Sequence, residues 1–424
     1  MGDFLENVLK SREKKAKQIQ TLLKIEPVVV SLKANIPGED KNINETYILL
    51  HIFSGLLLNR YPKAKLNVFN SSDGPYCLYT SLGEDSVTLK KIFMEIENSH
   101  PLGRFVDYDV YEKEKSLSRD DFGLSHRKCL ICEKDAWVCI KEQTHSSEDL
   151  LMVIQDNVNY YIKQVLEEAL NKAFLLELNL DPKFGLVTIA SNGSHTDMTY
   201  ETMKTSFTVI IPYLIQMYEL GYLTFNINQA FNEVRKIGLK AEEAMLKSTS
   251  GVNTYKGAIF LLGVILTALG RFHQRKFNED LIEIIQTMTA SILKELEKHA
   301  TTFGIKAHQD YRFFTARHEV YYGIPSVLTA LGYLNRYSSR NNEALMMTLI
   351  KIISLKNDTV ALKRAGSIEK YHQIVDLISS IKTYNLEQIS QVTTICIKEN
   401  ISFGGSADIL IATLFLDLIV DKLV

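Results

Sequence analysis

The spacing of hydrophobic residues changes about a third of the way along the chain. In the first 150 residues, short apolar stretches alternate with polar positions, and this period of two predicts β-strands. The stretch 28–36 alternates and ends at Pro37-Gly38, and residues 71–74 (Ser-Ser-Asp-Gly) predict a hairpin turn. We therefore expect a mixed α/β (α+β) domain over residues 1–150. Its expected helices are 4–24 and 86–98, and its expected strands are 28–36, 65–70, 75–81, 105–111 and 137–141.

From residue 151 onward the apolar residues recur at helical spacing, as in Val158, Ile162 and Val165, and strand signals are nearly absent. This pattern predicts an all-α domain over residues 151–424, with the join between the two domains inside 142–156. A fusion of two domains is also what the length of 424 residues favours. The expected helices, besides the one after residue 150, are 200–220, 227–246, 258–269, 278–298, 327–337, 341–353, 367–382, 386–399 and 407–424.

Composition excludes several classes of protein. The chain has 48 Lys+Arg against 50 Asp+Glu, so neither a nucleic-acid binder nor a polybasic membrane module is expected. The first 17 residues are charged and lack the apolar core of a signal peptide. The apolar runs 258–270 and 407–424 are interpreted as core helices, because the first is short and the second contains three Asp. We expect a cytoplasmic protein with reduced cysteines.

The loop 251–260, Gly-Val-Asn-Thr-Tyr-Lys-Gly-Ala-Ile-Phe, has the chemistry of a phosphate site. Glycine lets the backbone come close to a ligand, free N–H groups at a helix start point outward, and Lys256 adds a positive charge. An ordinary loop capping a buried helix is the alternative. Other polar motifs also interrupt the helices and could meet at one end of a bundle, where acidic groups would hold Mg²⁺ and basic groups would hold phosphate. They lie at 183–187, 192–198, 241–242, 317–319, 357–359, 364–366 and 402–408.

Taken together and in order, these motifs resemble the triphosphoribosyl-dephospho-CoA synthase of the citrate lyase system over roughly residues 155–424. The strongest matches are Asn192-Gly193-x-His195-x-Asp197-Met198, Ala241-Glu242-x-x-Met245, the 251–260 loop and Gly404-Gly405-Ser-Ala-Asp408. The resemblance implies that ATP and 3′-dephospho-CoA are joined with release of adenine. Because the transition state resembles an oxocarbenium ion, carboxylates are expected near it.

The expected roles follow from chemical type. We expect His195, Asp197, Glu242 and Asp358 to be catalytic, and Asp197 and Asp408 to hold Mg²⁺. Phosphate or nucleotide binding is expected of Lys183, Asn253, Lys256, Arg317, Arg364, Gly404 and Gly405. The chain departs from the family pattern where Phe184 and Phe403 replace prolines, Thr188 replaces an acid and Tyr255 replaces a histidine. The last two changes each remove a titratable group near the expected site.

The segment 100–110 carries the second chemical signal. On a strand, Asp107 and Asp109 point to the same face and could both reach one Mg²⁺, with His100 and Arg104 on the preceding loop. Such an arrangement is typical of nucleotidyl-type phosphoryl transfer. An edge strand with an acidic solvent face is the alternative.

The surroundings of this segment resemble the holo-acyl-carrier-protein synthase of citrate lyase, a phosphoribosyl-dephospho-CoA transferase, over about residues 1–150. The matching residues include 12–15, 35–38, 74–75, 100–110, Arg119 and 127–132. The resemblance implies that a serine of the citrate lyase acyl carrier (gamma) subunit attacks the α-phosphorus of the synthase product and expels pyrophosphate. Asp107 and Asp109 would carry catalytic Mg²⁺, and His100, Arg104, Arg119 and Arg127 would bind phosphate.

A possible zinc site follows the aspartates. Cys129-x2-Cys132-x6-Cys139-x5-His145 has a spacing that could form a structural zinc site, although reduced cysteines also pack as small apolar residues.

The sequence thus predicts a bifunctional transferase that makes and attaches the citrate lyase prosthetic group. Two alternatives remain: the same chemistry for another carrier, such as that of a malonate decarboxylase, or a non-catalytic assembly protein with a degenerate synthase half. Asn35-Ile-Pro-Gly38 and the cysteine cluster argue against the first, and Thr188 with Tyr255 motivates the second.

Overall fold

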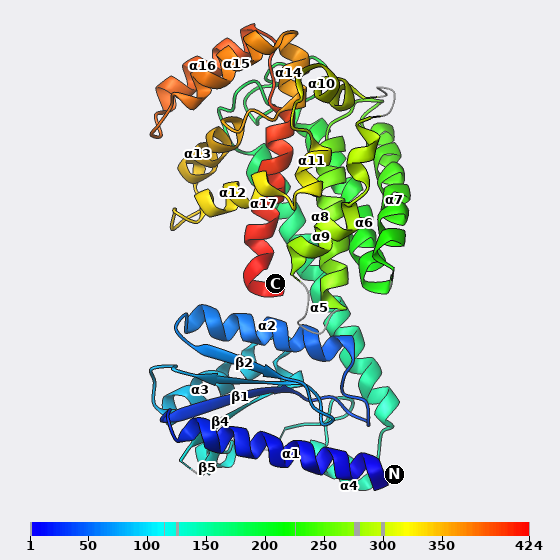
Figure 1. Cartoon of the computed structure of the whole chain (residues 1–424), viewed down its shortest axis with the longest axis vertical. Coiled ribbons are helices and arrows are strands. Elements are labelled where there is room, and N and C mark those ends of the chain that lie inside the picture. The colour runs from blue at the N-terminus through cyan, green and yellow to red at the C-terminus, as the bar shows by residue number, and fades with distance from the viewer. Residues whose placement is uncertain are drawn as a thin grey trace. The chain divides into compact units, whose positions relative to one another are not determined.

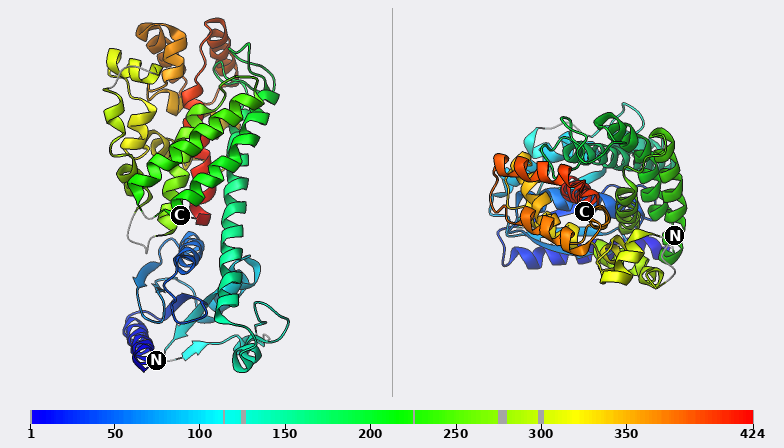
Figure 2. Two further views of the ribbon diagram at one scale, coloured as in Figure 1. Left: turned by 90° about the vertical axis from the view of Figure 1, so that its right-hand side faces the viewer. Right: turned by 90° about the horizontal axis from the view of Figure 1, so that it is seen from above.

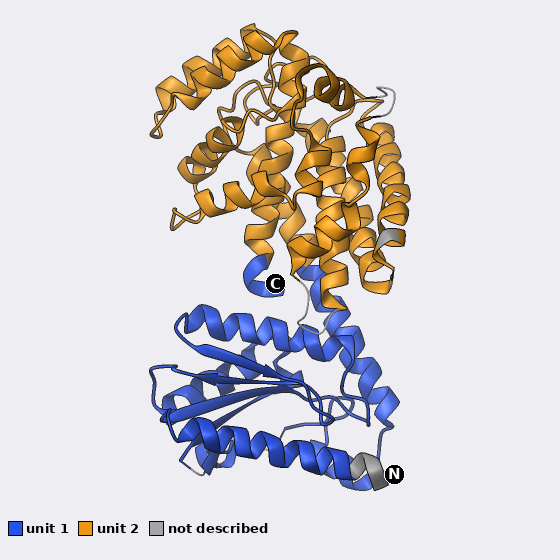
Figure 3. Cartoon of the chain, viewed as in Figure 1, with its two compact units in different colours: residues 1–165, 420–424 blue, residues 166–419 orange. Residues whose placement is uncertain are grey.

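The computed structural model describes residues 2–113, 115–123, 127–224, 226–274, 280–297 and 302–423. These residues form two compact units, which Figure 3 colours separately: unit 1 contains residues 1–165 and 420–424, and unit 2 contains residues 166–419. Unit 1 combines helices with a sheet and unit 2 is helical, so the predicted fold class is confirmed. Helix α5 (Ser147–Leu178) runs without a break through residue 150.

Unit 1 is built on a five-stranded antiparallel sheet with the strand order β2-β3-β1-β4-β5 (Figure 1). The predicted hairpin is confirmed, because Lys65 pairs with Thr80 and Phe69 with Tyr76. The central strand β1 pairs with both β3 and β4. The strands are β1 (Val28–Ala34), β2 (Lys65–Phe69), β3 (Tyr76–Thr80), β4 (Val106–Glu112) and β5 (Lys115–Leu117).

Helices cover both faces of this sheet. On one face, Tyr108 of β4 stacks on Phe93 of α3 (Ser86–Ser99) and donates its hydroxyl proton to the Phe53 carbonyl of α2 (Asn44–Arg60). On the other face, Ile19 of α1 (Gly2–Leu23) packs against Val29, Tyr76 and Leu78. Since side chains alternate along a strand, Asp107 and Asp109 of β4 lie on the α1 face.

Two predicted elements differ in the structure. Residues 137–141 were predicted as a strand but form helix α4 (Ala136–Glu142). The large apolar side chains there do not face a sheet, because Trp137 is 53% and Ile140 is 74% exposed. The long helix predicted at 278–298 is replaced, within the described residues, by α9 (Leu281–Thr289), capped by Asp280, and a 3-10 turn (Ile292–Glu295).

Unit 2 packs its helices around two almost fully buried ones, α8 and α17, the second of which is drawn in red in Figure 2. Among the described residues, α8 is the single helix long and apolar enough to cross a membrane, but 83% of that window is buried inside the protein, as in a core helix. The helices are α6 (Tyr200–Leu223), α7 (Ile227–Ser248), α8 (Lys256–His273), α10 (Phe303–Tyr311), α11 (Ala316–Tyr321), α12 (Pro325–Leu334), α13 (Asn342–Ile353), α14 (Thr359–Ala365), α15 (Ile368–Ser379), α16 (Leu386–Lys398) and α17 (Gly404–Leu423).

Helices α6 and α8 approach each other closely at two glycines. A Cβ on Gly221 would lie 2.0 Å from the Thr267 carbonyl oxygen, and one on Gly270 would lie 2.1 Å from the Tyr218 carbonyl oxygen. The Thr267 hydroxyl bonds across this contact to the Met217 carbonyl at 3.1 Å. Backbone atoms on both sides leave no room to adjust, so the contact requires glycine.

We expect Gly221→Ala to destabilise the protein by about 1–3 kcal/mol, because the added methyl group overpacks a backbone contact. Gly332→Ala is the matched control: Gly332 lies in α12, and no atom lies within 4 Å of the place that an added methyl group would take, so alanine should stabilise by about 0.5–1 kcal/mol. Urea denaturation followed by circular dichroism measures both changes. Identical midpoints for Gly221→Ala and wild type would contradict the close contact.

Candidate active sites

In unit 2, the polar loops that the sequence singles out lie together. The Ser194 hydroxyl donates to the Ile401 carbonyl at 2.7 Å, and Arg364 donates to the Ser194 carbonyl at 2.9 Å. Gly185 lets the chain pass close to Ile401, whose carbonyl oxygen would lie 1.9 Å from a Cβ at this position. The loops around residues 185, 194, 364 and 401 therefore form one structure.

His195 lies inside this loop cluster as a neutral imidazole. Burial and the neighbouring Arg364 guanidinium lower the pKa of His195 to about 4. Arg364 donates to Nδ1 at 3.0 Å, which leaves the ring proton on Nε2, 2.9 Å from the Ser402 hydroxyl. The carboxylate of Asp197, 56% exposed, lies 3.8 Å from Nδ1. His195 thus orders the loops, and a role toward the leaving base would require it to exchange Ser402 for substrate.

The carboxylate of Asp358 is fully used in holding two helix starts together. One oxygen accepts from the backbone N–H groups of Val360 and Ala361, both at 2.9 Å, and caps α14. The other accepts from the Ser406 N–H at 2.7 Å and its hydroxyl at 2.9 Å, at the start of α17. Gly405 leaves space for this carboxylate, which would lie 3.1 Å from a Cβ there. The structure therefore gives Asp358 a structural task, and its catalytic role stays a prediction.

Asp408 lies against the N-terminus of α8. A Cβ on Gly257 would come within 2.0 Å of its carboxylate, so Gly257 makes room for Asp408. Burial raises the pKa of Asp408, nearby Asp358 and Glu177 raise it further, and the Ala258 N–H opposes the shift. Its place beside the start of α8 makes this carboxylate a candidate acceptor for a substrate proton.

Lys183 is enclosed in the interior of unit 2. Its side chain is 1% exposed, and its ammonium donates at 2.6 Å to both the carboxylate and the backbone carbonyl of Glu177, which is itself buried. Burial lowers the pKa of Lys183, and the Glu177 carboxylate opposes that shift. The expected phosphate contact of Lys183 has no support in this geometry.

A cavity of about 620 Å³ opens beside the start of α8. Lys256 and Glu242 line it and pair at 2.7 Å, while the Asn253 side chain accepts from the Lys256 N–H and so ties the loop to the first residue of α8. Arg317 also lines the cavity and pairs with Glu295 at 3.0 Å. A volume of this size suits a nucleotide.

Sequence reasoning missed part of this network. Glu295 binds a second arginine, Arg235, at 2.6 Å, and Arg235 lines the same cavity. Burial alone would raise the pKa of Glu295, but hydrogen bonds from Arg235 and Arg317 lower it. These residues are far apart in sequence, so only the fold could reveal their meeting.

Two of the four departures from the family pattern, Thr188 and Tyr255, each remove a titratable group, and both make local contacts. The Thr188 hydroxyl accepts from the backbone N–H groups of Ala190 and Ser191 and so closes a turn. Tyr255 is 2% exposed and packs edge-on against Phe174. Burial raises the pKa of Tyr255, and Glu177 and Asp408 nearby raise it further. The Thr188 hydroxyl thus has hydrogen-bond partners, whereas the buried Tyr255 hydroxyl has none among the described residues.

In unit 1, three arginines lie near Glu97, and one of them contacts the predicted Asp107. Arg127 contacts Asp107 at 2.6 Å and Glu97 at 2.7 Å, and Arg119 contacts Glu97 at 3.2 Å. Arg104, Arg119, Arg127 and Glu97 line one cavity of about 220 Å³. Burial raises the pKa of Asp107, and the Arg127 guanidinium opposes that shift. Glu97, which holds two of the arginines, was not predicted, because it lies on an ordinary amphipathic helix.

A second cavity, of about 420 Å³, lies on the α1 side of Asp109. Three cationic side chains contact the buried Asp73 beside this cavity, and a fourth, Lys15, lies near Asp109. Asp73 accepts from Lys33 at 2.5 Å and from Arg12 and Lys41 at 3.1 Å each. Burial alone would raise the pKa of Asp73, but these three hydrogen bonds lower it. Burial also lowers the pKa of Lys15, which interacts electrostatically with Asp109. Sequence reasoning had assigned Asp73 only to a turn.

His100 uses both ring nitrogens within unit 1. Nδ1 accepts from the Leu102 N–H at 3.1 Å, and Nε2 lies 3.2 Å from the Tyr161 hydroxyl. Burial lowers the pKa of His100 to about 4, so the ring is neutral. Its observed contacts fix the loop before β4 and leave no free nitrogen for the expected phosphate.

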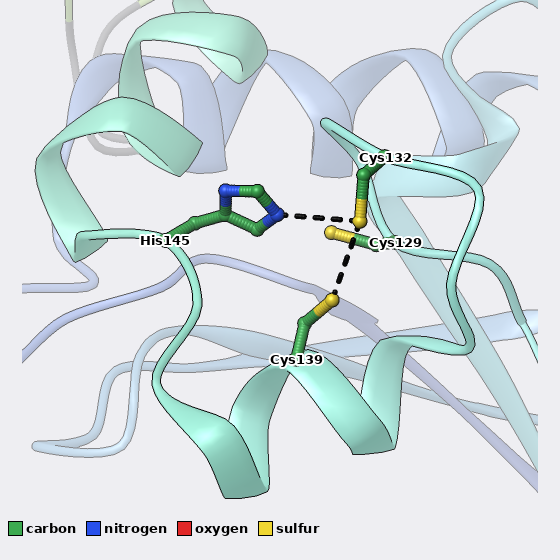
Figure 4. A group of neighbouring side chains, drawn as sticks. All are labelled: Cys129, Cys132, Cys139 and His145. Atoms are coloured by element: carbon green, nitrogen blue, oxygen red, sulfur yellow. Dashed lines mark hydrogen bonds between the residues drawn. The ribbon is translucent and has the colours of Figure 1, made fainter.

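The predicted cysteine and histidine cluster is formed. The ligand atoms of Cys129, Cys132, Cys139 and His145 all lie within 4.8 Å of one another (Figure 4). Cys132 Sγ lies 3.4 Å from Cys139 Sγ and 3.3 Å from His145 Nε2.

Comparison with known proteins matches each unit to a transferase family. Residues 163–423 match the family described as ATP:dephospho-CoA triphosphoribosyl transferase, and residues 4–161 match apo-citrate lyase phosphoribosyl-dephospho-CoA transferase. Protein CitXG of Leuconostoc mesenteroides subsp. cremoris is 33% identical over 99% of this chain and 98% of its own length. Protein CitXG of Haemophilus influenzae is 34% identical over 80% of this chain and 78% of its own. The 2-(5''-triphosphoribosyl)-3'-dephosphocoenzyme-A synthase of Haemophilus ducreyi is 30% identical over 67% of this chain and 98% of its own.

The protein is therefore a transferase made of two fused units, each with its own charged site. The end-to-end similarity to relatives of the same two-part construction narrows this class further. The chain belongs to the CitXG family, in which a CitX unit precedes a CitG unit.

We expect Glu177→Gln to destabilise the protein by about 3–5 kcal/mol, because it leaves the buried Lys183 ammonium without its carboxylate. The double variant Glu177→Met/Lys183→Met should recover most of that loss, since no buried charge remains. Urea unfolding of the three proteins checks this. A single variant as stable as wild type would mean that the Lys183 ammonium is not enclosed.

Proposed function

We propose that this chain makes and attaches the citrate lyase prosthetic group. Unit 2 would join ATP and 3′-dephospho-CoA to 2′-(5″-triphosphoribosyl)-3′-dephospho-CoA and release adenine. Unit 1 would transfer this product to a serine of the apo acyl carrier (gamma) subunit and release pyrophosphate. The observation that carries the proposal is the pair of separate sites. One has carboxylates and cations beside a nucleotide-sized cavity, and the other has two strand aspartates, of which Asp107 contacts Arg127 and Asp109 lines a cavity with Lys15 and Lys33.

In unit 2, the cavity beside α8 is the proposed site of ATP. Lys256 and Arg317 line it and are able to exchange their carboxylate partners for phosphate oxygens. The 2′-hydroxyl of dephospho-CoA attacks the anomeric carbon of the ATP ribose, the bond to adenine breaks, and adenine takes up a proton. Asp408, next to the cavity-lining Gly257, is the proposed acceptor of the hydroxyl proton.

In unit 1, the carrier serine attacks the α-phosphorus and the bond to pyrophosphate breaks. Arg127, Arg104 and Arg119 offset the charge that develops on the phosphate oxygens. The oxygen donors of Asp107 and Asp109, on one face of β4, fit Mg²⁺, which would neutralise the phosphates when bound.

In unit 2, the exposed carboxylate of Asp197 is the proposed magnesium ligand.

Because its substrates derive from ATP and CoA, the reaction is expected in the cytoplasm. A malonate decarboxylase type of carrier is the alternative partner, and offering each apo carrier in turn distinguishes the two. The alternative of a non-catalytic assembly protein, motivated by Thr188 and Tyr255, is tested by adenine release from ATP in the presence of dephospho-CoA.

For the synthase, we expect adenine to form from ATP only when dephospho-CoA is present. Lys256→Ala should reduce the rate about 10- to 100-fold through the loss of one charge-assisted phosphate contact, and Asp408→Asn should reduce it further. The matched control is Lys247→Ala, an exposed lysine on α7, which should leave the rate unchanged. Chromatographic assay of adenine gives the readout. Full activity of Asp408→Asn would refute its role as proton acceptor.

For the transferase, Asp109→Asn should reduce pyrophosphate release by about 10²-fold or more, because one of the two proposed magnesium ligands is weakened and the ion that neutralises the phosphates is held less well. Asp149→Asn changes an exposed carboxylate of α5 and serves as the control. Preformed triphosphoribosyl-dephospho-CoA and apo carrier are the substrates, so unit 2 is not needed. Adenine release by the same Asp109→Asn protein should stay at the wild-type rate, and its loss would contradict the division of labour.

A further inference from the structure

The four ligand atoms of the cysteine and histidine cluster converge on one centre. Cys129 and Cys132 lie on a short turn, Cys139 on α4, and His145 just before α5, and Figure 4 shows the side chains turned toward one another. Tetrahedral zinc with Zn–S bonds of about 2.3 Å separates neighbouring sulfur atoms by about 3.8 Å. The Cys132 and Cys139 sulfur atoms lie 3.4 Å apart, and His145 Nε2 lies 3.3 Å from the Cys132 sulfur. All four ligand atoms lie within 4.8 Å of one another, which is close to that arrangement.

Core packing does not explain this cluster. The other two cysteines, Cys77 and Cys396, are fully buried, whereas Cys129, Cys132 and His145 are only half-buried. The bulky apolar residues of the same segment point outward, as the exposure of Trp137 and Ile140 shows. A segment without an apolar core needs another source of stability, and a bound metal is the common one.

The same segment delivers Arg127 to the transferase site. The Ala136 N–H donates to the Arg127 carbonyl, and the Cys129 N–H donates to the Lys134 carbonyl, both at 2.8 Å. These bonds close the turn that carries Cys129 and Cys132. From its base, the Arg127 guanidinium reaches the Val106 carbonyl at 3.1 Å, as well as Glu97 and Asp107.

We propose that Cys129, Cys132, Cys139 and His145 bind a structural zinc ion and that this ion holds Arg127 against Asp107. The first part stands on the cluster alone, and the second rests on the proposed transferase function. Zinc would touch no substrate; it acts by fixing the turn from which Arg127 extends.

Trp137 makes the metal directly observable. It is the only tryptophan of the chain and lies between Cys132 and Cys139. Purified protein should contain one zinc per chain, and a chelator should remove it and change the Trp137 fluorescence. Cobalt added to the zinc-free chain should give the visible absorption of tetrahedral thiolate coordination. Cys132→Ser should lose the metal, whereas Cys77→Ala should keep it. Protein without zinc, with fluorescence that responds to neither chelator nor cobalt, would overturn the site.

A double perturbation tests the link to Arg127. In the zinc-bound chain, Arg127→Ala should lower pyrophosphate release by about 10²-fold. In the zinc-free chain, wild type should already have lost that activity, and Arg127→Ala should add little, because the guanidinium is no longer held. Adenine release should be unchanged throughout, which shows that unit 2 remains folded, and the far-UV circular dichroism of the zinc-free chain should match that of the zinc-bound chain if unit 1 keeps its fold. If zinc removal and Arg127→Ala each lower the rate and their effects multiply when combined, the positioning role is overturned. If the wild-type chain is inactive in transfer even with zinc bound, the proposed transferase itself is refuted.

Discussion

The site of unit 2 depends on one buried carboxylate. Asp358 accepts from two N–H groups at the start of α14 and from the N–H and hydroxyl of Ser406 at the start of α17. Because an unpaired buried carboxylate is costly, these bonds fix the two helix starts relative to each other. Asp408 lies two residues beyond Ser406, so the same contact sets its carboxylate against Gly257 and the N-terminus of α8. The loop that carries Lys256 is thereby placed beside the cavity.

In unit 1, a strand fixes the positions of the charged groups. Alternation along β4 buries Val106, Tyr108 and Val110 against α2 and α3 and leaves Asp107 and Asp109 on the opposite face. The apolar half of the strand therefore anchors the acidic half. Cations from separate elements then meet these aspartates: Arg127 from the cysteine segment and Lys15 from α1. In both units, the packed fold holds charged side chains close together, whereas free in water these side chains would move apart.

The sequence allowed much of this to be predicted, for reasons visible in particular residues. The period of two revealed β4 and its aspartates, and the spacing of Cys129, Cys132, Cys139 and His145 revealed their cluster. Helix α2 gave no such signal, because its buried residues cover nearly all sides and leave no periodic stripe. The loop around Lys183 has the residue types of a phosphate-binding loop, so a phosphate contact is expected there. In the structure, however, Lys183 is buried together with its partner Glu177, and a short motif does not reveal burial. The meeting of Arg235, Glu295 and Arg317 depends on helices far apart in sequence.

We propose that two complete and independent sites share this chain. The most direct test is to mix Lys256→Ala with Asp109→Asn and to measure, by mass spectrometry, the prosthetic group on the carrier serine with ATP, Mg²⁺ and dephospho-CoA as starting materials. Each variant alone should modify the carrier poorly, and the mixture should restore modification, because the product of one protein is free to reach the other. A mixture as inactive as its components, beside an active wild type, would contradict the account.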